Sequence, residues 1–195
     1  MPEKTTIITN CTLLTDAAAE LVPASFVTID KDRIRECGIM AKNPDPDSFD
    51  TVIDAAGGLV MPGLVNSHNH CAMTLFRGLA DDLELSDWLQ NNIFPAEAAH
   101  VNPEMVYWCT KLAAAEMLLS GTTTVADGYF FSGHAARALY DAGMRAVVAH
   151  GIVDFPAPSV PDPSKNIEAV KTFIENWQNH SSRISPAVFA HAPYT

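Results

Sequence analysis

The chain has 195 residues, of which 48% are hydrophobic and 18% are charged, a composition typical of a globular protein with a buried core. Its 23 acidic and 12 basic side chains give a formal net charge of −11, which argues against nucleic acid or an anionic membrane as a partner. No apolar run is long enough to cross a membrane, and the first residues lack the basic-then-apolar pattern of a secretory signal. The four cysteines are dispersed without a CxxC pair and indicate a reduced, cytoplasmic protein.

The first part of the chain has the composition of a small β-sheet. Residues 6–15 are rich in Thr and Ile, and residues 24–30 alternate apolar with polar side chains. Asp30–Asp32 then turns the chain into residues 33–39, which resume the β pattern. We therefore expect a β-hairpin in this part of the chain.

After residue 80, predicted helices and strands alternate. The clearest helix follows Asn102 as N-cap and Pro103 in its first turn, and it stops before Gly121. The later elements are a strand at 122–130, a helix at 132–143, a strand at 145–153, a helix at 164–177 and a strand at 185–194. With the strand before His68, they give four β-units joined by three helical connections, the pattern of a parallel sheet with helices outside it.

Two finer expectations concern the helices at 132–143 and 164–177. We expect Ser132 to open the first of them and Asp127, at the end of the preceding strand, to cap it. In the second, we expect one helical face to pack on the sheet. That face contains Ile167, Val170, Ile174 and Trp177.

Two histidines, His68 and His70, lie at the end of the apolar run LVMPGLVNSH. Because side chains alternate along a strand, both imidazoles project to the same face. Neutral imidazole is a preferred zinc ligand, and a catalytic zinc site keeps one position open for water. Three other strands also end in ionisable residues, Asp127, His150 and His191, at the strand ends where α/β proteins carry function. The sequence therefore predicts a metal site there, and a structural or surface histidine pair is the alternative.

Residues 57–89, GGLVMPGLVNSHNHCAMTLFRGLADDLELSDWL, together with FPAEAAH, LLSGTTTVADGYF and FAHAPYT further along, resemble the amidohydrolase superfamily. Within it, the chain is similar to the 5-methylthioadenosine/S-adenosylhomocysteine deaminases and their triazine-chlorohydrolase relatives. The resemblance implies an α/β fold in two parts. Residues 58–195 would be the first half of a metal-dependent (β/α)8 TIM barrel, and residues 1–57 would be part of a small β-sandwich domain that precedes it.

The resemblance also implies roles for single residues. His68 and His70 match the first two zinc ligands, at the end of the first barrel strand. Glu97 matches a glutamate that hydrogen-bonds the ribose hydroxyls of a nucleoside, although from its position alone it would be a solvated charge at a helix start. His191 matches a histidine that contacts the substrate. His150 stands where the family carries a substrate-binding arginine, and histidine is a weaker, pH-dependent partner for a homocysteine carboxylate.

The implied function is zinc-dependent hydrolytic deamination of a small adenosine-type nucleoside, with release of ammonia. Since a full barrel needs about 250 residues, we expect the chain to be the N-terminal part of a longer protein. The catalytic proton-shuttle glutamate and the remaining metal ligands are then expected beyond Thr195. Two alternatives stay open: a related enzyme acting on another heterocycle, such as an s-triazine or guanine, and a non-catalytic scaffold of the same fold. Other divalent transition metals and assembly as a homo-oligomer also stay open.

Overall fold

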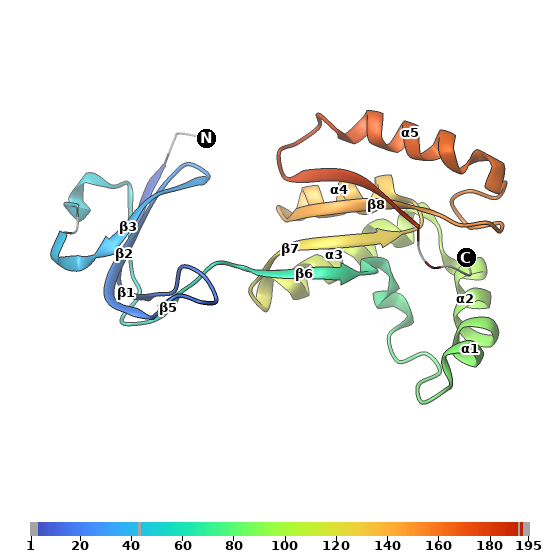
Figure 1. Cartoon of the computed structure of the whole chain (residues 1–195), viewed down its shortest axis with the longest axis horizontal. Helices are drawn as coiled ribbons and strands as arrows, with labels where there is room; N and C mark the ends of the chain where they lie inside the picture. The colour runs from blue at the N-terminus through green and yellow to red at the C-terminus, as the bar shows by residue number, and fades with distance from the viewer. Residues whose placement is uncertain (1–3, 43, 191, 193–195) are drawn as a thin grey trace. The chain divides into compact units, whose positions relative to one another are not determined.

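The computed structural model describes residues 4–42, 44–190 and 192. The chain divides into two compact units, Met1–Pro62 and Gly63–Thr195, and Figure 1 labels helices and strands of both. In the part of the chain that the structure describes, none of the helices combines the length and the apolar character that crossing a membrane requires.

The first unit is a β-sheet in the order β3-β2-β1-β4, and β5 also pairs with β1. Its elements are β1 (Thr5–Leu13), β2 (Val22–Asp30), β3 (Arg33–Ile39), the 3-10 turns η1 (Met40–Lys42) and η2 (Pro46–Ser48), β4 (Thr51–Asp54) and β5 (Leu59–Val60). β2 and β3 pair antiparallel from Asp30 and Arg33 outward, which confirms the predicted hairpin. Ile7, Cys11 and Phe26, each at most 1% exposed, lie in the core of this unit.

The second unit contains a parallel sheet in the order β6-β7-β8-β9. Its strands are β6 (Leu64–Asn69), β7 (Thr122–Tyr129), β8 (Arg145–Ile152) and β9 (Ile184–Ala190). The connections contain η3 (Cys71–Phe76), α1 (Leu85–Asp87), the π-helical turn η4 (Trp88–Ile93), α2 (Phe94–His100), α3 (Pro103–Leu119), α4 (Ser132–Ala142), η5 (Pro163–Lys165) and α5 (Asn166–Trp177). The order of strands and helices confirms the predicted α/β organisation.

One face of this sheet packs against the helices. Val125 on β7 and Val148 on β8 are fully buried, and they belong to the same apolar cluster as Val106 of α3 and Leu139 of α4. Residues that alternate with them are more open, as shown by Val147, which is 42% exposed. The helices therefore stabilise the sheet from one side, as alternation along the strands requires.

Gly63 lets β6 begin close to β7. A Cβ atom at this position would lie 2.1 Å from the Thr123 hydroxyl oxygen, far inside van der Waals contact. The next residue, Leu64, donates its N–H to the carbonyl of Gly121 at 2.9 Å. The glycine of the Pro62-Gly63 pair is thus needed for the pairing of the strand that carries the two histidines.

The predicted packing face of α5 is wrong at one position. Ile167 is 56% exposed, whereas Phe173, which the prediction omitted, is 6% exposed. Val170, Phe173 and Trp177 are the buried apolar residues of this helix. Their spacing of three and four residues follows the helical repeat, and Ile167 lies one turn before Val170 but rotated away from the contact.

The prediction that Asp127 caps α4 is also wrong. The N-cap of α4 is Phe131, which has a left-handed φ of 50° and makes no side-chain capping bond. Since β7 continues to Tyr129, Asp127 is still within the strand and too far along the chain from the first turn of α4 to cap it. Ser132 does begin the helix, and Gly143, with a φ of 84°, ends it as expected.

The N-cap of α3 offers a direct test of local helix energetics. The Asn102 side-chain oxygen accepts a hydrogen bond from the Met105 N–H at 3.0 Å. Replacement of Asn102 by Ala is expected to lower the free energy of unfolding by about 1 kcal/mol, because this N–H then loses its partner. Urea denaturation measures the change. Asn102→Ser keeps a capping oxygen and is expected to stay within a few tenths of a kcal/mol of the wild type; equal losses in both variants would contradict the capping role.

Candidate functional site

His68 and His70 lie together at the carboxyl end of β6, as their spacing predicts. The centroids of the two imidazole rings are 5.2 Å apart, and the ring planes are inclined at 78°. His68 is exposed, and His70 is half-buried. The pair is therefore close enough for both rings to reach one small ligand from the same side of the strand.

A hydrogen bond to the neighbouring strand orients the His70 ring. Its Nδ1 lies 2.5 Å from the carbonyl oxygen of Gly128 on β7. A carbonyl oxygen can only accept, so Nδ1 carries a proton, and in the neutral ring Nε2 then carries the lone pair. This is the state that a metal-ligating histidine needs, and a backbone carbonyl is a common partner for the other ring nitrogen. Among the described residues, no group of three or more His, Cys, Asp and Glu side chains is placed to hold a metal ion.

A cavity of about 510 Å³ opens beside His70, a size within the range of small-molecule sites. Its lining is mostly apolar and aromatic, with few polar groups, as in typical ligand pockets. His70 and Glu97 both line it, and so does Asn166 at the start of α5. The apolar walls include Trp88, Leu89, Ile93, Phe94, Tyr129, Phe155 and Phe189.

Glu97, on α2, is a buried carboxylate and not a solvated charge. It is 7% exposed, and its Oε1 accepts a hydrogen bond from the Tyr129 hydroxyl at 2.7 Å. Burial raises the pKa of Glu97, and the bond from Tyr129 and the nearby His70 imidazole oppose that rise. Burial and the adjacent carboxylate also raise the pKa of Tyr129, which keeps this hydroxyl a donor. The pair thus places an acceptor carboxylate in the wall of the cavity.

His150 lies apart from this cavity. It is 6% exposed on β8, and its Nδ1 is 2.9 Å from the hydroxyl oxygen of Ser132 at the start of α4. It borders a second, more open hollow together with Trp177 and Phe173. The structure therefore does not bring His150 next to the histidine pair. His191, the other predicted substrate contact, lies outside the described residues.

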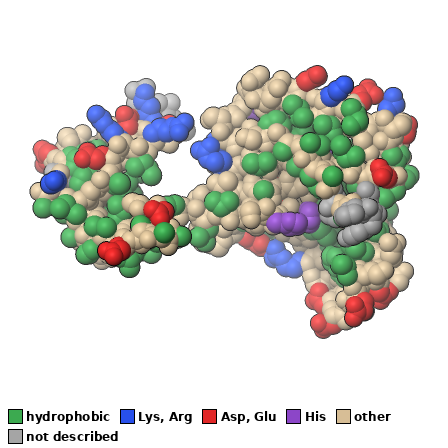
Figure 2. Space-filling model, viewed as in Figure 1, with side chains coloured by type: hydrophobic (Ala, Val, Ile, Leu, Met, Phe, Trp, Pro, Cys, Tyr) green, Lys and Arg blue, Asp and Glu red, His purple; other side chains and the backbone are tan. Residues whose placement is uncertain are grey.

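The rim beside the cavity is acidic. Asp81, Asp82, Glu84 and Asp87 are all exposed on the loop that leads into α1 and in α1 itself, and Figure 2 shows acidic side chains gathered at the end of the unit where Figure 1 labels α1. Leu85, within the same stretch, lines the cavity. A negative rim repels phosphorylated ligands and favours neutral or cationic ones.

Two residues of β7 take part in the site: Tyr129, which the sequence does not indicate, and Asp127, whose strand-end position allows contact with the site but for which the sequence favours a capping role. Tyr129 bonds Glu97, and Asp127 accepts the N–H of Cys71 at 2.6 Å. The signal that could have found them is their spacing of two, which turns both side chains to one face at the end of the strand. Nothing local in the sequence indicates which residues of η3 and α2 meet that face.

The model of the amidohydrolase family matches residues 59–195. The chain is 48% identical over 144 residues to a 5-methylthioadenosine/S-adenosylhomocysteine deaminase of Syntrophus aciditrophicus, a match covering 74% of this chain and 32% of the relative. It is 43% identical over 191 residues to a 5′-deoxyadenosine deaminase of Methanosarcina mazei, covering 97% of this chain and 43% of the relative.

This chain belongs to the amidohydrolase family. Among solved structures, an adenosine deaminase from Xanthomonas campestris with bound zinc superposes with a TM-score of 0.90 at 34% identity, covering 97% of this chain and 43% of the other. A triazine hydrolase of Arthobacter aurescens superposes with a TM-score of 0.84 at 20% identity, covering 99% of this chain and 48% of the other, and so shares the amidohydrolase fold. The chain spans about one third to two fifths of the length of the curated relatives it matches.

Burial of His150 predicts a pH dependence of stability in this amidohydrolase chain. Desolvation lowers the pKa of His150 from 6.5. Below pH 6.5 the unfolded chain takes up a proton at His150 that the folded protein still excludes. The free energy of unfolding therefore falls as the pH falls below this value, and at higher pH it does not depend on His150. On going from about pH 7 to about pH 5, the thermal midpoint of His150→Gln is expected to drop less than that of the wild type. His134→Gln, at an exposed position of α4, is the control; an equal drop in all three proteins would contradict the prediction.

Proposed function

We propose that this chain carries the first two metal ligands and the nucleoside-binding wall of a zinc-dependent hydrolytic deaminase that acts on an adenosine-type nucleoside. The observation that carries the proposal is one cavity lined by both His70 and Glu97. It brings a histidine in the metal-binding tautomer and a buried acceptor carboxylate to the same apolar space. The deaminase names of the relatives at 48% and 43% identity support the same class of reaction.

In the proposed site, His68 and His70 would hold the metal through imidazole nitrogens. A zinc ion supplies Lewis acidity that lowers the pKa of a coordinated water towards neutrality. The Gly128 carbonyl keeps the His70 tautomer fixed. Glu97, held by Tyr129, would accept hydrogen bonds from the ribose hydroxyls. The apolar and aromatic walls would exclude water and pack against the adenine ring.

We further propose that the parallel sheet is part of a (β/α)8 barrel over residues 58–195 and that residues 1–57 contribute to a small β-sandwich. Support comes from the exposed apolar side chains on the sheet face away from the helices. Val65 on β6 and Val147 on β8 are 66% and 42% exposed. In a closed barrel this face is the interior, where branched apolar residues fill the core.

The acidic rim favours a neutral nucleoside over a charged substrate. We propose 5′-deoxyadenosine, 5-methylthioadenosine, adenosine or S-adenosylhomocysteine as substrates in preference to nucleotides, whose phosphates would meet Asp81, Asp82, Glu84 and Asp87. The test is ammonia release by the full-length protein that contains this sequence, with these four compounds and an aminotriazine. Release from the nucleosides that His70→Ala abolishes is expected. Release from the aminotriazine alone would overturn the proposal.

The 195-residue chain by itself is expected to bind zinc weakly and to show no turnover. Two imidazoles fill two of the four positions of a tetrahedral zinc ion, and the described residues offer no third ligand beside them. Titration calorimetry with Zn²⁺ measures the affinity, with His70→Ala as the matched variant that removes one imidazole. Tight, stoichiometric zinc binding together with deaminase activity from this chain alone would contradict the prediction.

Replacement of Glu97 by Gln is expected to raise the KM for a nucleoside by about ten- to a hundredfold, because a charged acceptor for the ribose is lost. Gln keeps an oxygen that can accept from Tyr129, so the wall of the cavity is retained. The measurement is steady-state ammonia release with adenosine, compared with free adenine, which has no ribose and should be unaffected. Glu104→Gln, at an exposed position in the first turn of α3, is the matched control. An unchanged KM for adenosine would exclude Glu97 as the ribose partner.

A further inference from the structure

The peptide that directly follows His70 is held by a buried carboxylate on the neighbouring strand. The N–H of Cys71 donates to the Asp127 Oδ1 at 2.6 Å. Cys71 is 1% exposed and Asp127 is 3% exposed, so this bond is shielded from water. A hydrogen bond in such a low-dielectric environment is electrostatically stronger than one in water.

β7 therefore fixes His70 at two points. The Gly128 carbonyl holds the imidazole through Nδ1, and Asp127, one residue earlier on the same strand, holds the backbone just after it. The strand register agrees, since Asn69 lies opposite Asp127. The ring and the main chain of His70 are thus tied to adjacent residues of one rigid strand.

The carboxylate of Asp127 has one favourable and one unfavourable effect on stability. The Asp127 side chain also interacts with the Cys71 side chain, but its second oxygen, Oδ2, is buried and has no hydrogen-bond partner among the described residues. A buried polar atom without a partner is unfavourable, and an apolar side chain of similar size would avoid that penalty. The feature that an apolar residue could not supply is the acceptor for the Cys71 N–H.

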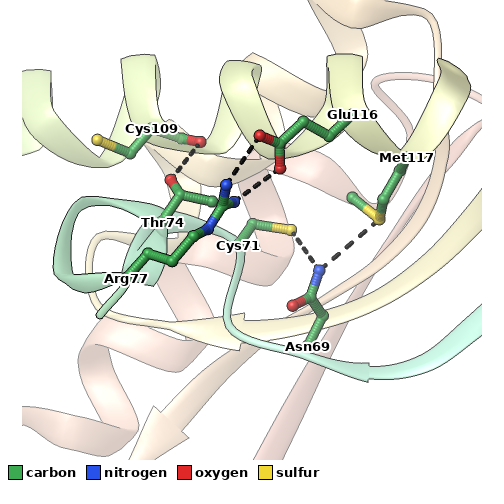
Figure 3. A network of polar contacts seen from close by, with 7 residues as sticks. All are labelled: Asn69, Cys71, Thr74, Arg77, Cys109, Glu116 and Met117. Carbon is green, nitrogen blue, oxygen red and sulfur yellow. Dashed lines mark hydrogen bonds and ion pairs between the residues drawn. The ribbon is translucent and has the colours of Figure 1, made fainter. Parts of the chain in front are cut away.

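Other contacts hold the segment from Asn69 to Arg77 against α3, as Figure 3 shows. The Asn69 amide contacts the Cys71 sulfur at 3.3 Å and the Met117 sulfur at 3.7 Å. Further along η3, the Thr74 hydroxyl donates to the Cys109 carbonyl. Beyond η3, Arg77 forms a bidentate ion pair with Glu116 of α3, with nitrogen–oxygen distances of 3.0 and 2.7 Å. These contacts anchor side chains and the far end of the segment. The main chain at the histidine is held by the Asn69 Oδ1, which accepts the His70 N–H at 2.9 Å, and by Asp127, which accepts the N–H of the next residue.

We propose that Asp127 is a positioning residue for the metal site: by fixing the peptide after His70, it sets the direction in which the His70 imidazole presents Nε2. The proposal rests on the proposed function of His68 and His70 as metal ligands. Asp127 itself does not need to contact metal or substrate in this role.

The test compares metal binding by four forms of the full-length protein that contains this sequence: the wild type, Asp127→Asn, Asp127→Leu and Val125→Ala. Asn keeps an oxygen that can accept from Cys71, whereas Leu fills a similar volume without an acceptor. Val125, buried two residues earlier on β7, is the matched control for loss of packing without loss of this bond. The readouts are the Zn²⁺ dissociation constant and the visible absorption bands of the Co²⁺-substituted protein, which report ligand geometry.

Asp127→Leu is expected to weaken Zn²⁺ binding by about ten- to a hundredfold and to shift the Co²⁺ bands, while Asp127→Asn restores both towards the wild type. Val125→Ala is expected to lower the thermal midpoint and leave the Co²⁺ bands unchanged. If Asp127→Leu does not fold, Asp127→Asn provides the test. Slow hydrogen exchange of the Cys71 amide and wild-type Co²⁺ bands in Asp127→Asn then support the same role. Wild-type bands and affinity in Asp127→Leu would overturn it. A wild-type protein that binds no metal would instead overturn the proposed function on which it rests.

Discussion

β6 and β7 pair in parallel, with Leu64 opposite Thr122 and Asn69 opposite Asp127. This pairing depends on close backbone approach at Gly63, where a side chain would collide with Thr123. It brings the carboxyl ends of both strands to the same edge of the sheet. His70, one of the two candidate metal ligands, then meets the carbonyl of Gly128, and the N–H of the next residue, Cys71, meets the carboxylate of Asp127.

At the carboxyl ends of β6 and β7, buried polar side chains form hydrogen bonds with defined partners. Glu97 is held by Tyr129, Asp127 holds Cys71, and the raised pKa of each carboxyl group has the same main cause, its removal from water. Inside a protein such groups interact more strongly than in water, and an unpaired one is correspondingly unfavourable. A site built in this way has little freedom to rearrange. That rigidity suits a metal site, whose ligands must converge within a few tenths of an ångström.

The sequence was sufficient for the order of strands and helices in the second unit, because hydrophobic periodicity and capping residues are local signals. Asn102 begins α3 and Gly143 ends α4, as expected. The spacing of His68 and His70 likewise predicts two imidazoles on one face. The errors have one origin: the partner of Asp127 and the exposure of Ile167 depend on which surfaces meet, which no short stretch of sequence contains.

Composition, strand alternation and the histidine spacing by themselves determined an acidic α/β chain with a paired-imidazole site at a strand end. The tertiary structure alone decided what surrounds that site. Glu97, which its position in the sequence indicates as a solvated charge, is a buried carboxylate in the cavity wall. His150 lies in a separate hollow beside Ser132. The physical reason is that burial and hydrogen-bond partners come from residues 18 to 58 positions away in the chain. Only the packing of helices on the parallel sheet brings those residues into contact.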